Sequence, residues 1–157
     1  MNSPAEPQSL RGAPTRHACW FQISGRKATG VGEARRTLGR QLRLWGMPEE
    51  MRDDAVLVMS ELTTNAIAHT DSTDIRCCAA VTPDYCVHLE VHDDDRRALD
   101  GPFPGTPTLR DETGRGLLLV GCIAEKWGMD RSVYTRGNAV WAALPCSVLS
   151  PVAALSA

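Results

Sequence analysis

The chain carries its most informative residues in the segment Glu61-Leu62-Thr63-Thr64-Asn65-Ala66-Ile67-Ala68-His69-Thr70, near the middle of its 157 residues. This segment ends an amphipathic run that predicts a helix from Pro48 to about His69. Residues four apart lie about 40° apart around a helix and about 6 Å apart along it, so we expect Glu61 and Asn65 to face one pocket. Asn is a mediocre helix former, because its side chain competes for backbone hydrogen bonds. Its position in an apolar helix therefore indicates a function, and magnesium-nucleotide chemistry is one that fits.

Glu61 and Asn65 each have a functional and an ordinary interpretation. Glu61 is a candidate general base, because a partly buried carboxylate can take a proton from a hydroxyl group or water. It is otherwise a solvated helix glutamate. Asn65 offers a neutral amide oxygen, which suits Mg²⁺ because that ion prefers few protein ligands together with phosphate oxygens. Taken alone, Asn65 is more simply a polar residue near a helix C-terminus, so the spacing leaves both interpretations open.

The residues around this segment predict an alternation of strands and helices. Helical spacing over Val31 to Trp45 is ended by Gly46-Met47-Pro48. Its outer face carries Arg35, Arg36, Arg40 and Arg43, which are either solvated or part of a partner-binding face. Strands are predicted over His17 to Ser24, Asp74 to Val81, Tyr85 to Asp93, about Trp127 to Thr135 and Asn138 to Leu144, and a further helix over Leu117 to about Lys126. This order predicts an α+β fold, a two-layer sandwich with helices on one face of a largely antiparallel sheet.

Alternation in the strand Tyr85 to Asp93 predicts which face of the sheet is buried. One face presents Val87, Leu89, Val91 and Asp93, and the other presents Cys86, His88, Glu90 and His92. The apolar face should pack on the helices, which places Asp93 at the end of a buried row. Its carboxylate there is a candidate acceptor for the exocyclic amino group of adenine, or simply a turn-starting aspartate. The face with the two histidines is expected to be solvated rather than a metal site, and Asp94 and Asp95 are expected to be solvated too.

A long loop, Asp94 to Thr113, precedes the candidate phosphate site. Loops of this length inside a domain are usually functional or mobile. The loop ends at Gly114-Arg115-Gly116, which predicts the start of a helix. Free backbone N–H groups and the helix dipole make such a start an anion site, and glycines let a phosphate approach closely, although a flexible loop end with a helix cap has the same pattern. The dinucleotide motif G-x-G-x-x-G is excluded because Leu119 takes the place of its third glycine, and the phosphate loop G-x-x-x-x-G-K-[ST] is absent.

Composition predicts a single globular domain. A hydrophobic content of 43%, a charged content of 23% and a net charge of −2 give no indication of nucleic-acid binding. No apolar run is long enough to span a bilayer. We expect residues 1–14 to be a disordered leader, residues 15–145 to form the domain and residues 146–157 to be a flexible tail. The six cysteines lack metal-ligand spacing, so we expect free thiols in a cytoplasmic protein.

Four motifs in this order and spacing resemble the Bergerat-fold ATP-binding superfamily, which includes gyrase B, MutL and the ATPase domains of histidine kinases. They are Glu61 to Ala66 with His69, Val91-His92-Asp93, Gly114 to Val120, and Trp127-Gly128 before Gly137 to Trp141. The chain is most similar to the small actinobacterial anti-sigma-factor serine kinases of the RsbW and SpoIIAB type. The resemblance covers roughly Phe21 to Leu144.

The resemblance implies roles for individual residues. Glu61 would be the catalytic base, Asn65 would bind Mg²⁺ and phosphate, and Asp93 would bind the adenine amino group. The phosphates of ATP would be held by Gly114, Arg115, Gly116 and Leu117. A lid over about Asp95 to Thr113 would cover them.

Two departures from the family pattern affect the expected activity. Asp95 stands where the family often has glycine, and its charge would lie near the triphosphate. Ala139 stands where the family often has a threonine whose hydroxyl supports the adenine pocket. The absence of this hydroxyl would cost about 1 kcal/mol of binding free energy. Both departures weaken the expectation of vigorous kinase activity.

The function implied by the resemblance is an ATP-dependent serine kinase. It would bind a sigma factor and phosphorylate an anti-anti-sigma (STAS-domain) protein, with ATP and Mg²⁺ as cofactors, and a homodimer is implied only by the same resemblance. The alternative is a non-catalytic module of the same fold that binds protein partners with or without nucleotide. An ATP-hydrolysing module of a larger machine is a weaker third interpretation.

Overall fold

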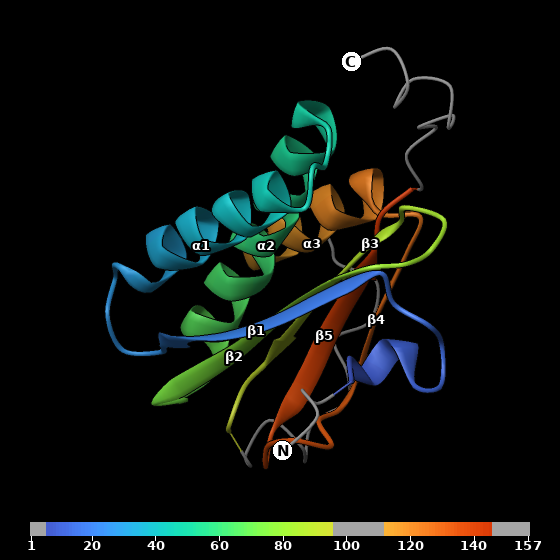
Figure 1. Cartoon of the computed structure of the whole chain (residues 1–157). Helices are drawn as coiled ribbons and strands as arrows, with labels where there is room; N and C mark the ends of the chain where they lie inside the picture. The colour runs from blue at the N-terminus through green and yellow to red at the C-terminus, as the bar shows by residue number, and fades with distance from the viewer. Residues whose placement is uncertain (1–5, 96–111, 146–157) are drawn as a thin grey trace.

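Five antiparallel strands form one sheet, and the three α-helices of the described residues lie together on one of its faces (Figure 1). The computed structural model describes residues 6–95 and 112–145. The order of the strands across the sheet is β1-β2-β3-β5-β4. The elements are η1 (Gln8–Leu10), β1 (His17–Ser24), α1 (Gly30–Leu44), α2 (Glu49–His69), β2 (Asp74–Val81), β3 (Val87–His92), α3 (Glu112–Ile123), β4 (Lys126–Arg131) and β5 (Asn138–Ala143). This architecture confirms the α+β two-layer class predicted from the sequence.

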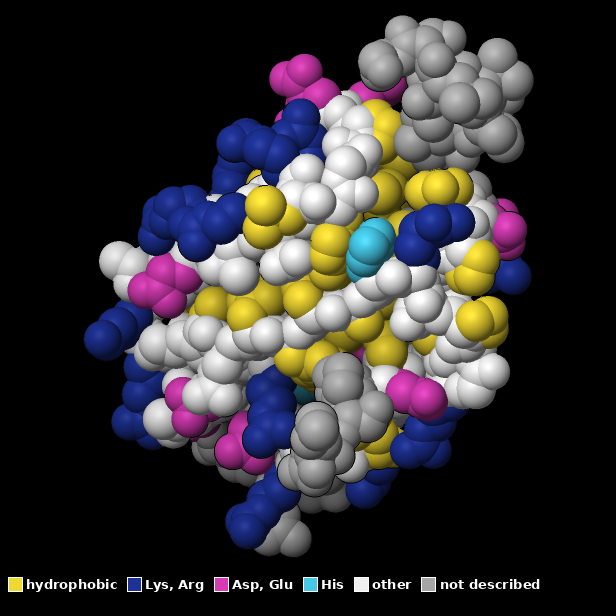
Figure 2. Space-filling model, in the orientation of Figure 1, with side chains coloured by type: hydrophobic (Ala, Val, Ile, Leu, Met, Phe, Trp, Pro, Cys, Tyr) yellow, Lys and Arg dark blue, Asp and Glu magenta, His cyan; other side chains and the backbone are white. Residues whose placement is uncertain are grey.

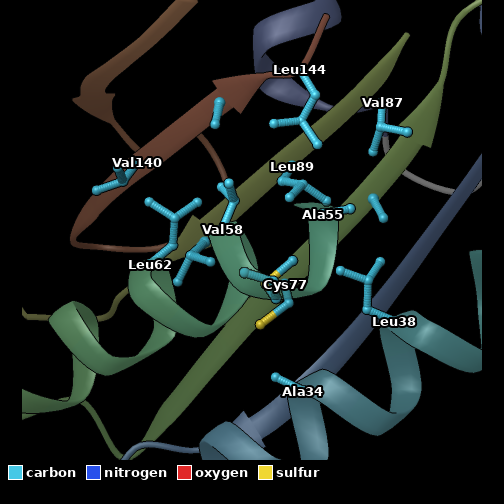
Figure 3. Close-up of a cluster of buried hydrophobic side chains, with 14 of the residues drawn as sticks. Ala34, Leu38, Ala55, Val58, Leu62, Cys77, Val87, Leu89, Val140 and Leu144 are labelled. Carbon is cyan, nitrogen blue, oxygen red and sulfur yellow. The ribbon is translucent and has the colours of Figure 1, made fainter. Parts of the chain in front are cut away.

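The helices attach to the sheet through apolar stripes. In α1 the buried side chains Ala34, Leu38 and Leu42 recur every four residues. In α2 the amphipathic run predicted from the sequence is confirmed, because Ala55, Val58 and Leu62 are buried and the half-buried Met51 packs against the same core. Figure 3 shows side chains from both helices meeting those of the sheet, among them Cys77, Leu89 and Val140.

A glycine turn separates α1 from α2, as the sequence predicts. Gly46 has a φ of 73°, a left-handed conformation that glycine adopts without strain. The N–H of Met47 then donates to the carbonyl of Leu42 at 3.0 Å, which closes the end of α1. The turn lets α2 pack against α1, so the residues Glu61 and Asn65 lie on a helix held by both its neighbour and the sheet.

The pairing of β3 sets the two faces of the sheet. Val91 lies opposite Cys77 of β2 and Val140 of β5, and these three residues join the core under the helices. Paired residues in an antiparallel sheet share a face, so the apolar row predicted for β3 is confirmed.

The opposite face of β3 is not solvated, which corrects the sequence prediction. Glu90 is 1% exposed and His92 is fully buried. The segment η1 covers them, since the N–H groups of Gln8 and Ser9 donate to the two carboxylate oxygens of Glu90 at 3.0 Å and 2.5 Å. Part of the expected disordered leader is therefore an ordered turn on the face of the sheet opposite the helices. Residues 1–5 and the expected tail, 146–157, lie outside the described residues.

The cysteines depart in part from the expectation of free thiols. Cys19, Cys77, Cys78 and Cys122 are free, and burial raises the pKa of Cys19 to about 11. Cys86, just before β3, is disulfide-bonded. In the described part of the chain, no helix has the length and apolar character needed to cross a membrane.

Candidate functional site

Glu61 and Gly116 lie against one another where α2 packs on α3. A methyl group added at Gly116 would come within 2.5 Å of Oε2 of Glu61, so the carboxylate occupies the space that a side chain there would fill. Glu61 is half-buried, and within the described residues its carboxylate forms no hydrogen bond. A glycine at position 116 is therefore required for Glu61 to take this position.

Asn65 lies one turn further along α2 than Glu61. Its side chain is half-buried and makes no hydrogen bond to another described residue. Polar groups without protein partners at such a depth are available for a ligand. Glu61 and Asn65 therefore lie four residues apart on one helix, as predicted, and neither side chain forms a hydrogen bond to another described residue.

Asp93 follows β3 directly and is 6% exposed. Its Oδ1 accepts hydrogen bonds from the N–H groups of Asp95 at 3.0 Å and Asn138 at 3.1 Å. Its own N–H donates to the carbonyl of Asn138 at 3.0 Å. Among the described residues, no donor reaches Oδ2. One oxygen thus fixes the side chain, and the other is available to accept from a ligand.

The surroundings of Asp93 raise the pKa of its carboxyl group. Burial is the largest cause, and the neighbouring charge of Asp95 acts in the same direction. The backbone hydrogen bonds from Asp95 and Asn138 oppose the shift without cancelling it. The ionised carboxylate accepts hydrogen bonds. As the pH falls, it becomes protonated at a higher pH than the carboxylate of an ordinary aspartate.

Two residues that support Asp93 were not assigned a role from the sequence. A methyl group at Gly137 would lie 2.0 Å from Oδ1 and 2.5 Å from the carbonyl oxygen of Asp93, so only glycine fits beside it. The hydroxyl of Thr135 donates to the same carbonyl at 2.5 Å. The hairpin glycine was visible in the sequence, but its contact with a residue more than forty positions earlier was not.

Asp95 is buried rather than solvated, which corrects a second expectation. It is 9% exposed, and its Oδ2 accepts from the N–H of Asp71 at 3.0 Å. Its charge is thus held against the segment that follows α2. Asp94 is exposed, as predicted.

Ala139 does not lie on the face of Asp93, so the expected loss of a hydroxyl from the adenine pocket is not supported. Ala139 pairs with His92, and paired side chains share a face. That face is the one covered by η1, away from the helices. The residue is 1% exposed there.

The predicted phosphate-binding segment is part of a helix that begins earlier than expected. Because α3 starts at Glu112, the N–H groups of its first turn that lack a partner inside the helix include that of Gly114, whereas those of Arg115, Gly116 and Leu117 lie beyond that turn. The side chain of Leu117 is buried in the core and is a packing residue. The side chain of Arg115 and most of the predicted lid, residues 96–111, lie outside the described residues.

Comparison with protein families agrees with this geometry. The family model of the histidine kinase-like ATPase domain matches residues 25–144, and the chain belongs to this family. Domains of the family bind ATP together with Mg²⁺ and have kinase-like function. No curated protein matches the chain.

The residues present fit a magnesium nucleotide. Oδ2 of Asp93 and the amide of Asn65 are polar groups without described partners, and Glu61 and Asp93 occupy the space that side chains at positions 116 and 137 would fill. Among the described residues no three His, Cys, Asp or Glu side chains gather to hold a metal ion by themselves. A magnesium ion here would therefore take phosphate oxygens among its ligands, as Mg²⁺ commonly does.

Proposed function

We propose that the protein is an ATP-dependent serine kinase that also binds a sigma factor and phosphorylates an anti-anti-sigma (STAS-domain) protein. The observation that carries the catalytic part is the position of the Glu61 carboxylate, half-buried, without a described hydrogen-bond partner and in contact with Gly116 of α3. A half-buried carboxylate that no described group holds is available to act on the hydroxyl of a bound substrate.

The proposed roles follow from what each group can donate or accept. Asp93 accepts from the adenine amino group through Oδ2, since Oδ1 is already occupied. Asn65 offers its amide oxygen to Mg²⁺, and the start of α3 at Gly114, Arg115 and Gly116 binds phosphate, with the free N–H of Gly114 among its donors. Glu61 takes the proton of the attacking hydroxyl. Mg-ATP, when bound, would supply the γ-phosphoryl group and leave as ADP, and positioning and electrostatics account for most of the rate in such transfers.

The exposed face of α1 supports the regulatory part of the proposal. Its side chains Arg35, Arg36, Arg40 and Arg43 are all exposed. Figure 2 shows Lys and Arg side chains gathered over this helix. Within the described residues none of the four forms an ion pair, although Arg36, Arg40 and Arg43 follow the i, i+4, i+7 spacing of one helix face. Such a stripe on an otherwise weakly acidic protein suits an acidic surface of a protein partner.

The second candidate function is a non-catalytic module of the same fold. Asp95 favours it, because this residue stands where the family often has glycine and its buried carboxylate is bound to the N–H of Asp71. In this function nucleotide is a conformational ligand or absent, and partner binding does not depend on Glu61. A cytoplasmic location and a homodimer accompany both functions as predictions.

The test compares the wild-type protein with the variant Glu61→Gln. Isothermal titration measures Mg-ATP binding, and radiolabelled γ-phosphate measures transfer to a STAS-domain protein. We expect similar affinity for Mg-ATP and a loss of transfer of about 10²- to 10⁴-fold, because Gln keeps the shape but cannot take a proton. Asn65→Ala should weaken Mg-ATP binding itself. Transfer that is unchanged in Glu61→Gln removes Glu61 from catalysis, and a wild-type protein that binds Mg-ATP without transferring phosphate favours the non-catalytic module.

A further inference from the structure

Two hydrogen-bonded bridges join the end of α2 to the end of β3. In the first, the carboxylate of Asp95 accepts from the N–H of Asp71 at 3.0 Å. In the second, the N–H of Asp94 donates to Oγ of Ser72 at 2.7 Å. Ser72 is 2% exposed, so this second bridge is shielded from water.

The second bridge continues into α2. The hydroxyl of Thr70 lies 2.9 Å from Oγ of Ser72 and donates to the carbonyl of Ala66 at 2.6 Å. Ala66 follows Asn65 directly in the last turns of the helix. The turn that leaves β3 is therefore bound to the part of α2 that presents the candidate magnesium ligand.

Asp95 contributes to Asp93 as well as to α2. Its N–H donates to Oδ1 of Asp93 at 3.0 Å while its carboxylate holds Asp71. Asp95 thus holds Oδ1 of Asp93 through its N–H, and its carboxylate joins the turn after β3 to the segment that follows α2. Tyr85 is the one described non-glycine residue with a positive φ, so the backbone at Asp95 does not need the glycine that the family often has there.

We infer that Asp95 is a positioning residue that sets the distance between Asp93 and Asn65, an inference that rests on the nucleotide site proposed above. Asp93 would contact the adenine end of ATP and Asn65 the phosphate end. A ligand that spans both ends depends on their separation, whereas a ligand that reaches only one end does not. Asp95 therefore favours adenine nucleotides over adenosine.

The experiment titrates Mg-ATP and adenosine into the full chain and into three variants. Asp95→Ala removes the bridge to Asp71, and Asp95→Asn keeps an oxygen that accepts from the same N–H. Asp94→Ala is the matched control, because the exposed side chain of Asp94 takes no part in the bridges and its backbone N–H is retained. Urea unfolding of each variant reports whether it is folded.

We expect Asp95→Ala to lower Mg-ATP affinity about tenfold, the loss typical of one hydrogen bond to a charged group. Adenosine affinity should change much less, so the ratio of the two affinities falls. Asp95→Asn should restore most of the ratio, and Asp94→Ala should leave it unchanged.

Three outcomes overturn the inference. Equal losses for both ligands in Asp95→Ala would assign Asp95 a purely structural role, and no loss for either would make the bridge irrelevant to binding. A wild-type protein that binds neither ligand refutes the proposed nucleotide site first and the inference with it. If Asp95→Ala does not fold, Ser72→Ala breaks the second bridge and should lower the same ratio; an unchanged ratio counts against positioning.

Discussion

The two carboxylate oxygens of Asp93 have different roles at this site. Oδ1 receives two backbone N–H groups and leaves Oδ2 as the acceptor for a ligand. The hydroxyl of Thr135 donates to the backbone carbonyl of Asp93, and Gly137 lies against the same carbonyl and Oδ1. The side chain is thus preorganised, which lowers the cost of binding.

Replacing Asp93 by Asn should reverse the preference for adenine. Asn retains a carbonyl oxygen for the two N–H groups but presents a donor where Oδ2 was, opposite the amino group of adenine. We expect ATP affinity to fall and the ratio of ATP to GTP binding to decrease, because the carbonyl of guanine accepts from the new donor. Competition titrations with the two nucleotides measure the ratio; an unchanged ratio places adenine elsewhere.

The raised pKa of Asp93 gives adenosine binding a pH dependence. Binding needs the ionised carboxylate, so affinity should fall as the pH falls through the raised pKa, above the ordinary range near 3.8. The contribution of Asp93 to the stability of the folded state changes with pH in the opposite direction to adenosine affinity. The folded state binds the proton more tightly than the unfolded state, so the free energy of unfolding contributed by Asp93 rises as the pH falls in that window. Adenosine titrations at decreasing pH, from 7.5 toward the ordinary aspartate range, test the first effect, and in Asp93→Asn both effects should disappear.

Gly116→Ala should separate stability from activity. Alanine in place of a helical glycine stabilises by about 0.5–1 kcal/mol, but the added methyl would displace the flexible end of Glu61. We expect unchanged or raised stability in urea together with reduced phosphoryl transfer. The control is Gly39→Ala in α1, whose methyl would meet Cγ2 of Val56 at an ordinary 3.7 Å. Equal transfer by both variants would show that Gly116 does not accommodate a catalytic Glu61.

At the scale of elements, η1 joins the sheet through one buried carboxylate. Glu90 accepts from Gln8, Ser9 and Nε2 of His92, the last at 2.9 Å. Nδ1 of His92 lies 2.8 Å from Oγ of Ser132, so the network extends to the turn between β4 and β5. Burial alone would raise the pKa of Glu90, but the hydrogen bonds from His92, Ser9 and Gln8 outweigh it and hold the pKa below its usual value.

Glu90→Ala should therefore release η1 and destabilise the protein by about 3–5 kcal/mol, because it leaves buried donors without a partner. The pH dependence follows from the lowered pKa. The stabilisation is present above the unfolded-state pKa, near 4.5, and is lost as the pH falls through the folded value. Urea unfolding at pH 7 and pH 3.5 measures both effects. Glu125→Ala, an exposed position, should change stability little.

At the scale of the whole molecule, the candidate site lies at the boundary between the two layers. Asn65 and Glu61 belong to the helical layer, whereas Asp93 and Gly137 belong to the ends of sheet strands. A nucleotide that contacts both layers joins them. Its binding should then appear in the stability of the whole chain.

Mg-ATP should raise the free energy of unfolding by about 2.7 kcal/mol at a free concentration of 100 times Kd. Thermal unfolding with and without Mg-ATP tests this without reference to any partner. Asn65→Ala should reduce the shift at the same ligand concentration, because its affinity is lower. A midpoint that does not depend on Mg-ATP concentration contradicts nucleotide binding by the folded state.

The sequence predicted the elements well because their signals are local. The bounds of β1 and β2 agree with the prediction, and the apolar row of β3 and the glycine turn at Gly46 were readable from periodicity and composition. The pair Glu61 and Asn65 needed only the geometry of one helix. Family membership followed from motifs whose order along the chain is itself a property of the sequence.

Only the tertiary structure decided which polar residues are buried and what they contact. Alternation showed that Glu90 and His92 share a face, but not that residues eighty positions earlier cover it. The burial of Asp95 and the contact of Gly116 with Glu61 likewise depend on how separate elements pack. Local sequence determines the dihedral angles and the apolar stripe of an element. The partner of a polar group depends on how the whole chain packs. Glu61 and Asn65 therefore became a candidate site only when α3 packed against Glu61 and hydrogen bonds joined the end of α2 to the turn after Asp93.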